Sequence, residues 1–138
     1  MHPLAPELPV AAQANVTAAY IANATVPSRW KTEGRGFPDV SAFSTDVCIS
    51  DGCAEAGTSC AAPIVASAIA TLNAVRAAAG KSALGFVNPL LYAHAADAFT
   101  DVTAGSGNGY PLATGWDPVT GLGVPQMGKL KEIVLALP

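Results

Sequence analysis

The chain has 138 residues, of which 51% are hydrophobic and only 12% are charged, and its formal net charge is −3. An average protein carries about twice that share of charge, so the composition excludes a disordered segment and fits a chain that buries most of its surface. Because the sequence shows neither a basic cluster nor an apolar run of ~20 residues, we expect neither nucleic acid nor a membrane as a partner.

The first part of the chain predicts helix and short strands in alternation. We expect an extended lead-in, a helix, a polar loop and a strand over residues 1–12, 13–22, 26–36 and 39–43. Residues 47–49 and 53–56 predict two strands joined by a tight turn. Cys48 and Cys53 flank that turn, and the pattern fits a disulfide as well as two free thiols.

Two Asn-X-Thr sequences, beginning at Asn15 and Asn23, match the acceptor pattern for N-glycosylation. Such short patterns arise often by chance, so neither carries weight alone. The first residues do not place a basic stretch before an apolar one, so the signal of an exported protein would lie upstream of them.

The second part of the chain is dominated by an alanine-rich stretch over residues 58–79 that is apolar nearly all round. This pattern predicts a largely buried helix, ended by Gly80. A shorter helix over 89–96, a glycine-rich loop over 103–123 and a closing helix over 126–137 should follow. The alternation of strand and helix predicts an α/β fold with a largely parallel sheet and helices packed against it.

Ser59 lies where the glycine turn at Gly57 opens into the long helix. Backbone N–H groups at a helix start are unpaired and carry a partial positive charge, which could stabilise an oxyanion formed next to the serine. A serine at a helix start is also a common N-cap, so the local pattern leaves both roles open. Because position 61 is alanine, the segment is not the Gly-X-Ser-X-Gly turn of the α/β-hydrolases.

Five segments in order resemble the sedolisin family of serine-carboxyl peptidases, and its tripeptidyl-peptidases in particular. These segments are residues 35–42, 57–63, 84–92, 99–103 and 115–123. The resemblance is clear from about residue 35 and implies that residues 1–138 are the C-terminal portion of a subtilisin-like catalytic domain. It further implies a peptidase that acts on peptides or proteins at acid pH in a secreted, lysosomal or vacuolar location.

For the site, the resemblance implies that Ser59 is the nucleophile and that one Ca²⁺ ion binds in the region of residues 101–117. The ligands implied are two carboxylates and three backbone carbonyls, those of Asp101, Asp117, Val102, Ala113 and Gly115. Read without the resemblance, Asp101 and Asp117 are ordinary turn formers.

The glutamate and aspartates that activate the serine in this family lie upstream of the Gly-Thr-Ser segment, and the 58 residues before Ser59 do not contain those motifs. Glu55 and His94 are poor substitutes, and a serine without a base is a poor nucleophile. We therefore expect the isolated chain to be inactive and the upstream part of the same domain to be its partner. The alternative is a truncated homologue that serves as a calcium-stabilised binding or structural module.

Overall fold

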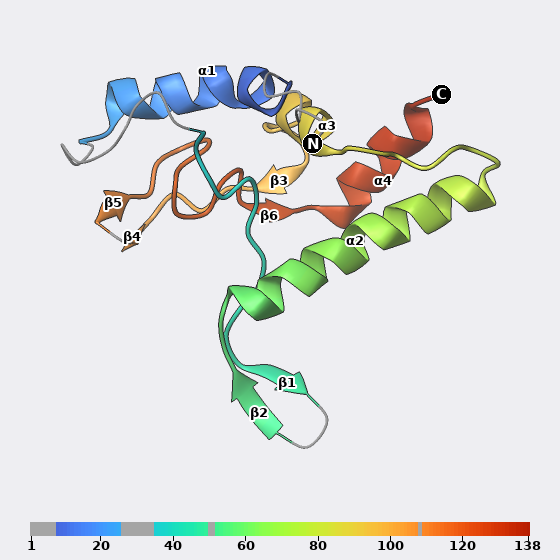
Figure 1. Ribbon diagram of the computed structural model, residues 1–138, viewed down its shortest axis with the longest axis horizontal. Coiled ribbons are helices and arrows are strands. Elements are labelled where there is room, and N and C mark those ends of the chain that lie inside the picture. Colours follow the sequence, from blue (N-terminus) through green and yellow to red (C-terminus); the bar gives the residue numbers. More distant parts are fainter. Residues whose placement is uncertain (1–7, 26–34, 50–51, 108) are drawn as a thin grey trace, which may run out of the picture.

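The computed structural model describes residues 8–25, 35–49, 52–107 and 109–138, with the backbone alone at 8–11, 49 and 52–55. Helices and short strands alternate along the described chain, as the sequence predicts (Figure 1). The helices are α1 (Leu8–Asn23), α2 (Thr58–Ala78), α3 (Asn88–Ala93) and α4 (Met127–Ala136). The strands are β1 (Val47–Ile49), β2 (Gly52–Glu55), β3 (Phe99–Thr100), β4 (Ser106–Gly107), β5 (Tyr110–Pro111) and β6 (Val124–Pro125).

The strands form three antiparallel pairs, β1 with β2, β3 with β6 and β4 with β5. The first pair is the predicted hairpin, in which Val47 lies opposite Glu55. Within the described residues no parallel pair occurs, so the expected parallel sheet is not found here. The pairing of Cys48 is not settled either, because the side chain of Cys53 lies outside the described residues.

The strand predicted over residues 39–43 is absent. This segment has no regular secondary structure, and its backbone is hydrogen-bonded to the loop at Gly121: Leu122 N–H donates to Asp39 O and Ser41 N–H donates to Gly123 O. Two such bonds do not make a ladder, because strand geometry needs a neighbouring strand over several residues. The prediction was wrong for this chain because strand composition supplies no partner.

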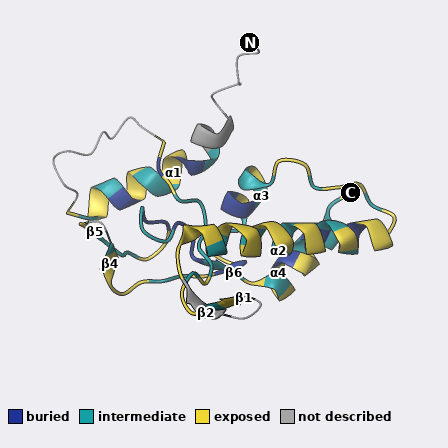
Figure 2. Cartoon of the chain, turned by 60° about the horizontal axis from the view of Figure 1, so that its bottom comes forward, coloured by how far each residue is buried: buried dark blue, intermediate teal, exposed yellow. Residues whose placement is uncertain are grey.

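The predicted helices are present, but α1 begins at Leu8, inside the segment that the sequence predicts to be extended. α2 begins at the predicted residue and ends one residue early. Its burial is the main departure: among its residues only Leu72 and Arg76 are buried, and the rest of the helix is exposed or half-buried (Figure 2). A helix that is apolar on all sides becomes buried only where other elements pack against each side. Here α4 packs against one side of α2. By length and composition α2 is also long and apolar enough to cross a membrane, contrary to the expectation from the sequence.

The core joins two layers. In one layer α1 packs against α3, and in the other α2 packs against α4. The buried side chains between them are Tyr20, Leu72, Leu91, Tyr92, Ala98, Phe99, Trp116, Leu122, Leu130 and Val134. Tyr20 of α1 meets Trp116 edge to face, with ring centroids 6.0 Å apart, in a geometry that aromatic pairs favour. The glycine-rich loop that carries Trp116 is thereby held against α1.

Candidate functional site

Ser59 is exposed at the start of α2, where the hairpin strand β2 turns into the helix. The N-cap is Gly57, whose φ of 135° suits a residue without a side chain. Gly57 N–H donates to Ser44 O at 2.7 Å, which fixes the helix start against the segment that enters the hairpin. No side chain caps the helix, so Ser59 does not have the N-cap role that the local pattern left open.

A groove of about 590 Å³ runs beside this helix start. One wall is formed by Phe37 to Val40 and by Ala42. The other wall is formed by one side of the first turns of α2, and Ser59, next to the lining residue Thr58, is not itself part of it; its members are Thr58, Ala61, Ala62, Val65 and Ala66. Phe37 is 75% exposed at its rim. The groove is almost wholly apolar, and its described acidic side chain is Asp39.

Asp39 does not serve as a base for Ser59 in this structure. Its carboxylate accepts two hydrogen bonds from Arg35 at 2.6 and 2.7 Å and one from the Tyr92 hydroxyl at 2.7 Å. Among the described residues, no hydrogen bond or ion pair joins Ser59 to a carboxylate or an imidazole, and the side chain of Glu55 lies outside them. The structure thus presents an exposed hydroxyl at a helix start without an activating partner among the described side chains.

The five residues expected to bind calcium lie in the second part of the chain. Hydrogen bonds from backbone N–H groups to carboxylates join four of them in two pairs. Gly115 N–H donates to Asp101 Oδ2 at 2.7 Å, and Ala113 N–H donates to Asp117 Oδ2 at 3.2 Å. Both carboxylates therefore bracket the turn over residues 113–115, and Val102 follows Asp101 directly. Ser59 contacts none of them in the described structure.

Asp117 is fully buried and organises the turn that follows it. Its Oδ1 accepts the backbone N–H groups of Val119 and Thr120 at 2.9 and 2.8 Å. Its backbone pairs with Gly121 in both directions, so a closed loop surrounds the carboxylate. This is the local structure that an aspartate favours in turns.

Asp101 differs from Asp117 in one respect that bears on a metal. Its second oxygen, Oδ1, is buried and has no hydrogen-bond partner. A buried carboxylate oxygen without a partner is costly, and a bound cation is one way to satisfy it. In the described part of the chain no three His, Cys, Asp or Glu side chains lie together as a metal cluster. Two carboxylates with backbone carbonyls suit Ca²⁺, which accepts oxygen ligands of either kind.

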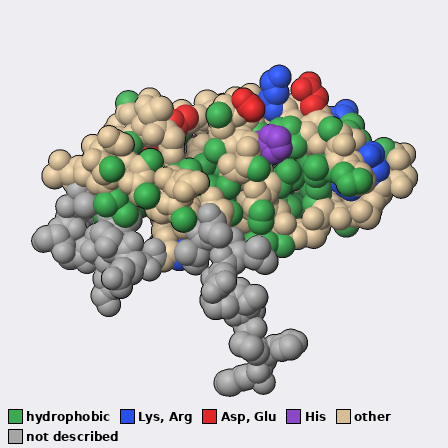
Figure 3. Space-filling model, turned by 90° about the horizontal axis from the view of Figure 1, so that it is seen from above, with side chains coloured by type: hydrophobic (Ala, Val, Ile, Leu, Met, Phe, Trp, Pro, Cys, Tyr) green, Lys and Arg blue, Asp and Glu red, His purple; other side chains and the backbone are tan. Residues whose placement is uncertain are grey.

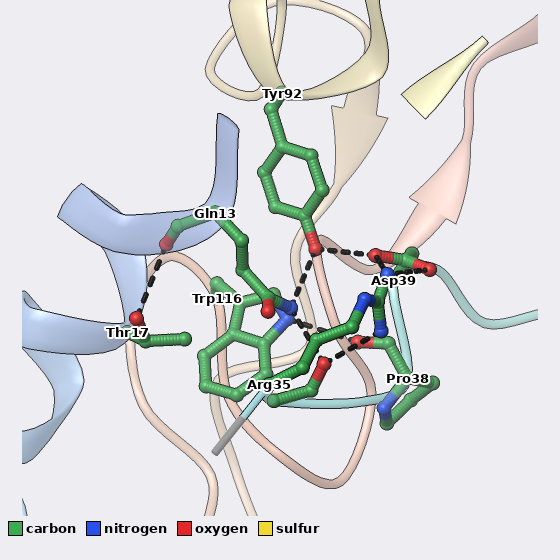
Figure 4. A network of polar contacts seen from close by, with 8 residues as sticks. Gln13, Thr17, Arg35, Pro38, Asp39, Tyr92 and Trp116 are labelled. Atoms are coloured by element: carbon green, nitrogen blue, oxygen red, sulfur yellow. Dashed lines mark hydrogen bonds and ion pairs between the residues drawn. The ribbon is translucent and has the colours of Figure 1, made fainter. Parts of the chain in front are cut away.

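A buried polar network adjoins both regions (Figure 4). Gln13 of α1, only 2% exposed, donates to Gly36 O at 2.8 Å and to the Tyr92 hydroxyl at 2.9 Å. Tyr92 in turn donates to Asp39, and Trp116 Nε1–H donates to Pro38 O at 2.9 Å. Burial, together with the hydrogen bond to Asp39, raises the pKa of Tyr92 far above its ordinary value, so this hydroxyl remains a donor.

Sequence reasoning did not predict this network. The sequence places Asp39 only in the predicted strand over residues 39–43 and Gln13 only in the predicted helix over residues 13–22. The available signal is spacing, because Gln13 lies on the same helix face as Val16 and Tyr20, which pack into the core. A polar residue on an apolar face predicts a buried hydrogen-bond partner but does not identify it.

Tripeptidyl-peptidases of fungi and of Dictyostelium are similar to this chain over most of its length, while no family model matches it. Tripeptidyl-peptidase sed4 of Aspergillus fumigatus is 45% identical over 132 residues, covering 76% of this chain and 22% of that protein. Tripeptidyl-peptidase sed1 of the same fungus is 45% identical over 113 residues, covering 76% and 17%. Tripeptidyl-peptidase 1 of Dictyostelium discoideum is 39% identical over 125 residues, covering 82% and 21%.

The chain therefore spans about a fifth of the length of the relatives that it matches. Taken with these identities, the order of the five sequence segments shows that the chain belongs to the sedolisin family of tripeptidyl-peptidases.

Proposed function

We propose that this chain is the C-terminal portion of the catalytic domain of a serine-type tripeptidyl-peptidase and that Ser59 is the nucleophile. The observation that carries the proposal is the position of Ser59: it is exposed, it does not cap its helix, and it lies in a chain that resembles tripeptidyl-peptidases at 39–45% identity. The substrates are then peptides or proteins with an accessible amino end.

In this proposal the Ser59 hydroxyl attacks the carbonyl carbon of the scissile peptide bond. The backbone N–H groups at the start of α2 face the oxyanion that forms, where the partial positive charge of the helix stabilises it. By the family resemblance, a glutamate from the upstream part takes the hydroxyl proton, one aspartate orients that glutamate, and another completes the oxyanion site. A carboxylate base functions near its own pKa, so the reaction belongs at acid pH.

The upstream part of the domain is the proposed cover for the groove beside Ser59. The segment over 39–43 has the composition of a strand, and Val40 and Ala42 line the groove rather than a described strand neighbour. A strand from the upstream part, laid along this edge, would begin the largely parallel, subtilisin-like sheet that the resemblance implies. It would also bring the missing carboxylates toward Ser59.

One Ca²⁺ ion is proposed at the turn between Asp101 and Asp117. The two carboxylates and the carbonyls of Val102, Ala113 and Gly115 would hold it, and the partnerless Asp101 Oδ1 supports that assignment. The ion would stabilise the loop by neutralising two carboxylates held at one turn. We propose a structural role for it and a secreted, lysosomal or vacuolar location for the protein.

The test is peptidase activity of the full-length protein at acid pH with a substrate that releases a tripeptide. Ser59→Ala should lower kcat/KM by at least about 10³-fold, because the nucleophile is lost. Ser67→Ala is the matched control: this serine is exposed on the same helix, donates only to Ile64 O, and should leave activity unchanged. Full activity of a correctly folded Ser59→Ala protein would refute the proposal.

A further inference from the structure

α1 carries two asparagines in Asn-X-Thr sequences, Asn15 and Asn23, and both are exposed. The same helix buries Gln13 and Tyr20 against the core. Neither asparagine belongs to the proposed catalytic or calcium machinery. The two asparagines have the same sequence pattern, but the structure places them in different local conformations.

The sequence at Asn15 lies within regular helix. The Thr17 hydroxyl donates back to Gln13 O and Ala14 O, at 3.2 and 3.1 Å, so the threonine is engaged with the helix backbone. Val16, between the two, packs against the core. Presenting this sequence in an open conformation requires unwinding the part of α1 that holds the buried Gln13.

The sequence at Asn23 lies where the helix ends. Asn23 is the last residue of α1, and Thr25 is exposed beyond the helix. Glycosylation acceptors belong on surface loops, and this one is already at a loop. The Asn23 amide donates to Ala19 O at 2.8 Å, and since an amide nitrogen carries two hydrogens, one can be replaced while the other keeps this bond.

The surroundings of Asn23 leave room for a bulky group. Asn23 borders a small open hollow of about 140 Å³ between α1 and the turn over residues 113–115. The groove beside Ser59 has no lining residue in common with this hollow. A glycan at Asn23 is therefore compatible with the upstream part packing in that groove.

We propose that Asn23 is an N-glycosylation site and that Asn15 is largely unmodified. This inference rests on the location outside the cytosol given under the proposed function. Asn23 Nδ2 forms a bond to the anomeric carbon of an oligosaccharide that is supplied as a lipid-diphosphate donor. The bond from that carbon to the diphosphate oxygen breaks, the lipid diphosphate leaves with the electron pair, and the amide nitrogen loses one proton to a base of the transferase.

The test uses the full-length protein, made with its own export signal in a eukaryotic cell. The isolated protein is treated with a peptide-N-glycosidase in ¹⁸O water, which converts each glycosylated asparagine into labelled aspartate. Cleavage after Tyr20 then places Asn15 and Asn23 on different peptides for mass spectrometry. We expect strong label at Asn23 and several-fold less at Asn15.

Two threonine variants provide the matched comparison. Thr25→Ala keeps Asn23 but destroys its acceptor pattern. The variant should therefore lose one glycan and migrate faster in electrophoresis, and Thr25→Ser should restore the glycan and the original mobility. Thr17→Ala should leave the mobility unchanged. An unlabelled Asn23, a Thr25→Ala protein with unaltered glycan content, or equal label at Asn15 would each overturn the inference. Peptidase activity of the same preparation is scored separately, so a glycosylated but inactive protein contradicts only the proposed function.

Discussion

At the scale of single residues, Gly121 shows how closely two distant segments approach. A Cβ added at Gly121 would lie 2.4 Å from the carbonyl carbon and oxygen of Asp39, and the φ of this glycine is +62°. The neighbouring bond from Leu122 N–H to Asp39 O holds the two backbones at that distance. The contact joins the proposed calcium loop to the segment that precedes the hairpin, so it connects the two candidate regions.

Gly121→Ala should lower the free energy of unfolding by at least about 1–2 kcal/mol, from the positive φ alone, and by more as the Asp39 backbone is displaced. Gly128→Ala is the control, because it lies in α4 with nothing within 4 Å of the added Cβ. That variant should be neutral or gain about 0.5–1 kcal/mol in helix stability. Urea unfolding of both variants makes the measurement, and equal effects would contradict the close approach at Gly121.

At the scale of elements, Arg76 joins the ends of two helices. The guanidinium of this buried residue donates to Ser82 O, Val134 O and Pro138 O. It therefore satisfies backbone carbonyls at and beyond the C-terminal end of α4, which a helix cannot pair internally. A cation in the last turn of α2 also interacts favourably with the dipole of that helix, and the packing of α2 against α4 adds this larger role.

Arg76→Leu should lower the free energy of unfolding by about 2–4 kcal/mol, because three carbonyls lose a charged donor together. The control is Lys129→Ala, which removes only an ion pair with Glu132 at 3.7 Å between largely exposed side chains. Such pairs contribute about 0–1 kcal/mol. If both variants unfold at the same urea concentration as the parent protein, the carbonyl contacts of Arg76 do not stabilise the fold.

The proposed calcium loop is a second test at this scale. A ligand that binds only the folded state raises stability with the logarithm of its free concentration, so a chelator should lower the Tm of the folded protein. Asp101→Asn is the more specific variant, because its remaining side-chain oxygen can still accept the hydrogen bond from Gly115 N–H. Asp117→Asn also disturbs the carboxylate that accepts the hydrogen bond from Ala113 N–H. We expect Asp101→Asn to lower Tm and to abolish the chelator effect. Coincident melting curves with and without chelator in the parent protein would remove the calcium site.

At the scale of the whole molecule, apolar surface is the dominant feature. Phe37, Phe43 and Phe86 are 75%, 77% and 61% exposed, and most of α2 is uncovered. Figure 3 shows one face on which hydrophobic side chains gather between sparse charged ones. Contiguous apolar surface of this kind marks an interface, and the proposed upstream part of the domain would cover it.

The isolated 138-residue chain should therefore bind a hydrophobic dye and self-associate at micromolar concentration, while the full-length protein should do neither. Phe37→Ser, which changes the rim of the groove beside Ser59, should reduce self-association several-fold. Phe86→Ser is the matched control, because that phenylalanine is similarly exposed but does not line the groove. Sedimentation velocity measures the outcome. A monodisperse chain without dye binding would show that the groove is not an uncovered interface.

The sequence alone determined the features that depend on a few neighbouring residues. It predicted the hairpin about residues 50–52 and the position of Ser59 at a helix start, and it predicted α2 and α4 to within one or two residues. Turn residues, helix-ending glycines and apolar runs act over a few positions, so they can be recognised without the fold. The order of its segments also indicated the family.

Only the tertiary structure decided which distant groups meet. Gln13 and Tyr92 are 79 positions apart, and Arg76 and Val134 are 58 apart, yet each pair is joined by a hydrogen bond. The burial of α2 is a second case. Its composition predicts a buried helix, but the described neighbours leave most of it exposed or half-buried. Burial and long-range pairing depend on which surfaces the folded chain brings together, and that is a property of the whole structure rather than of any one segment.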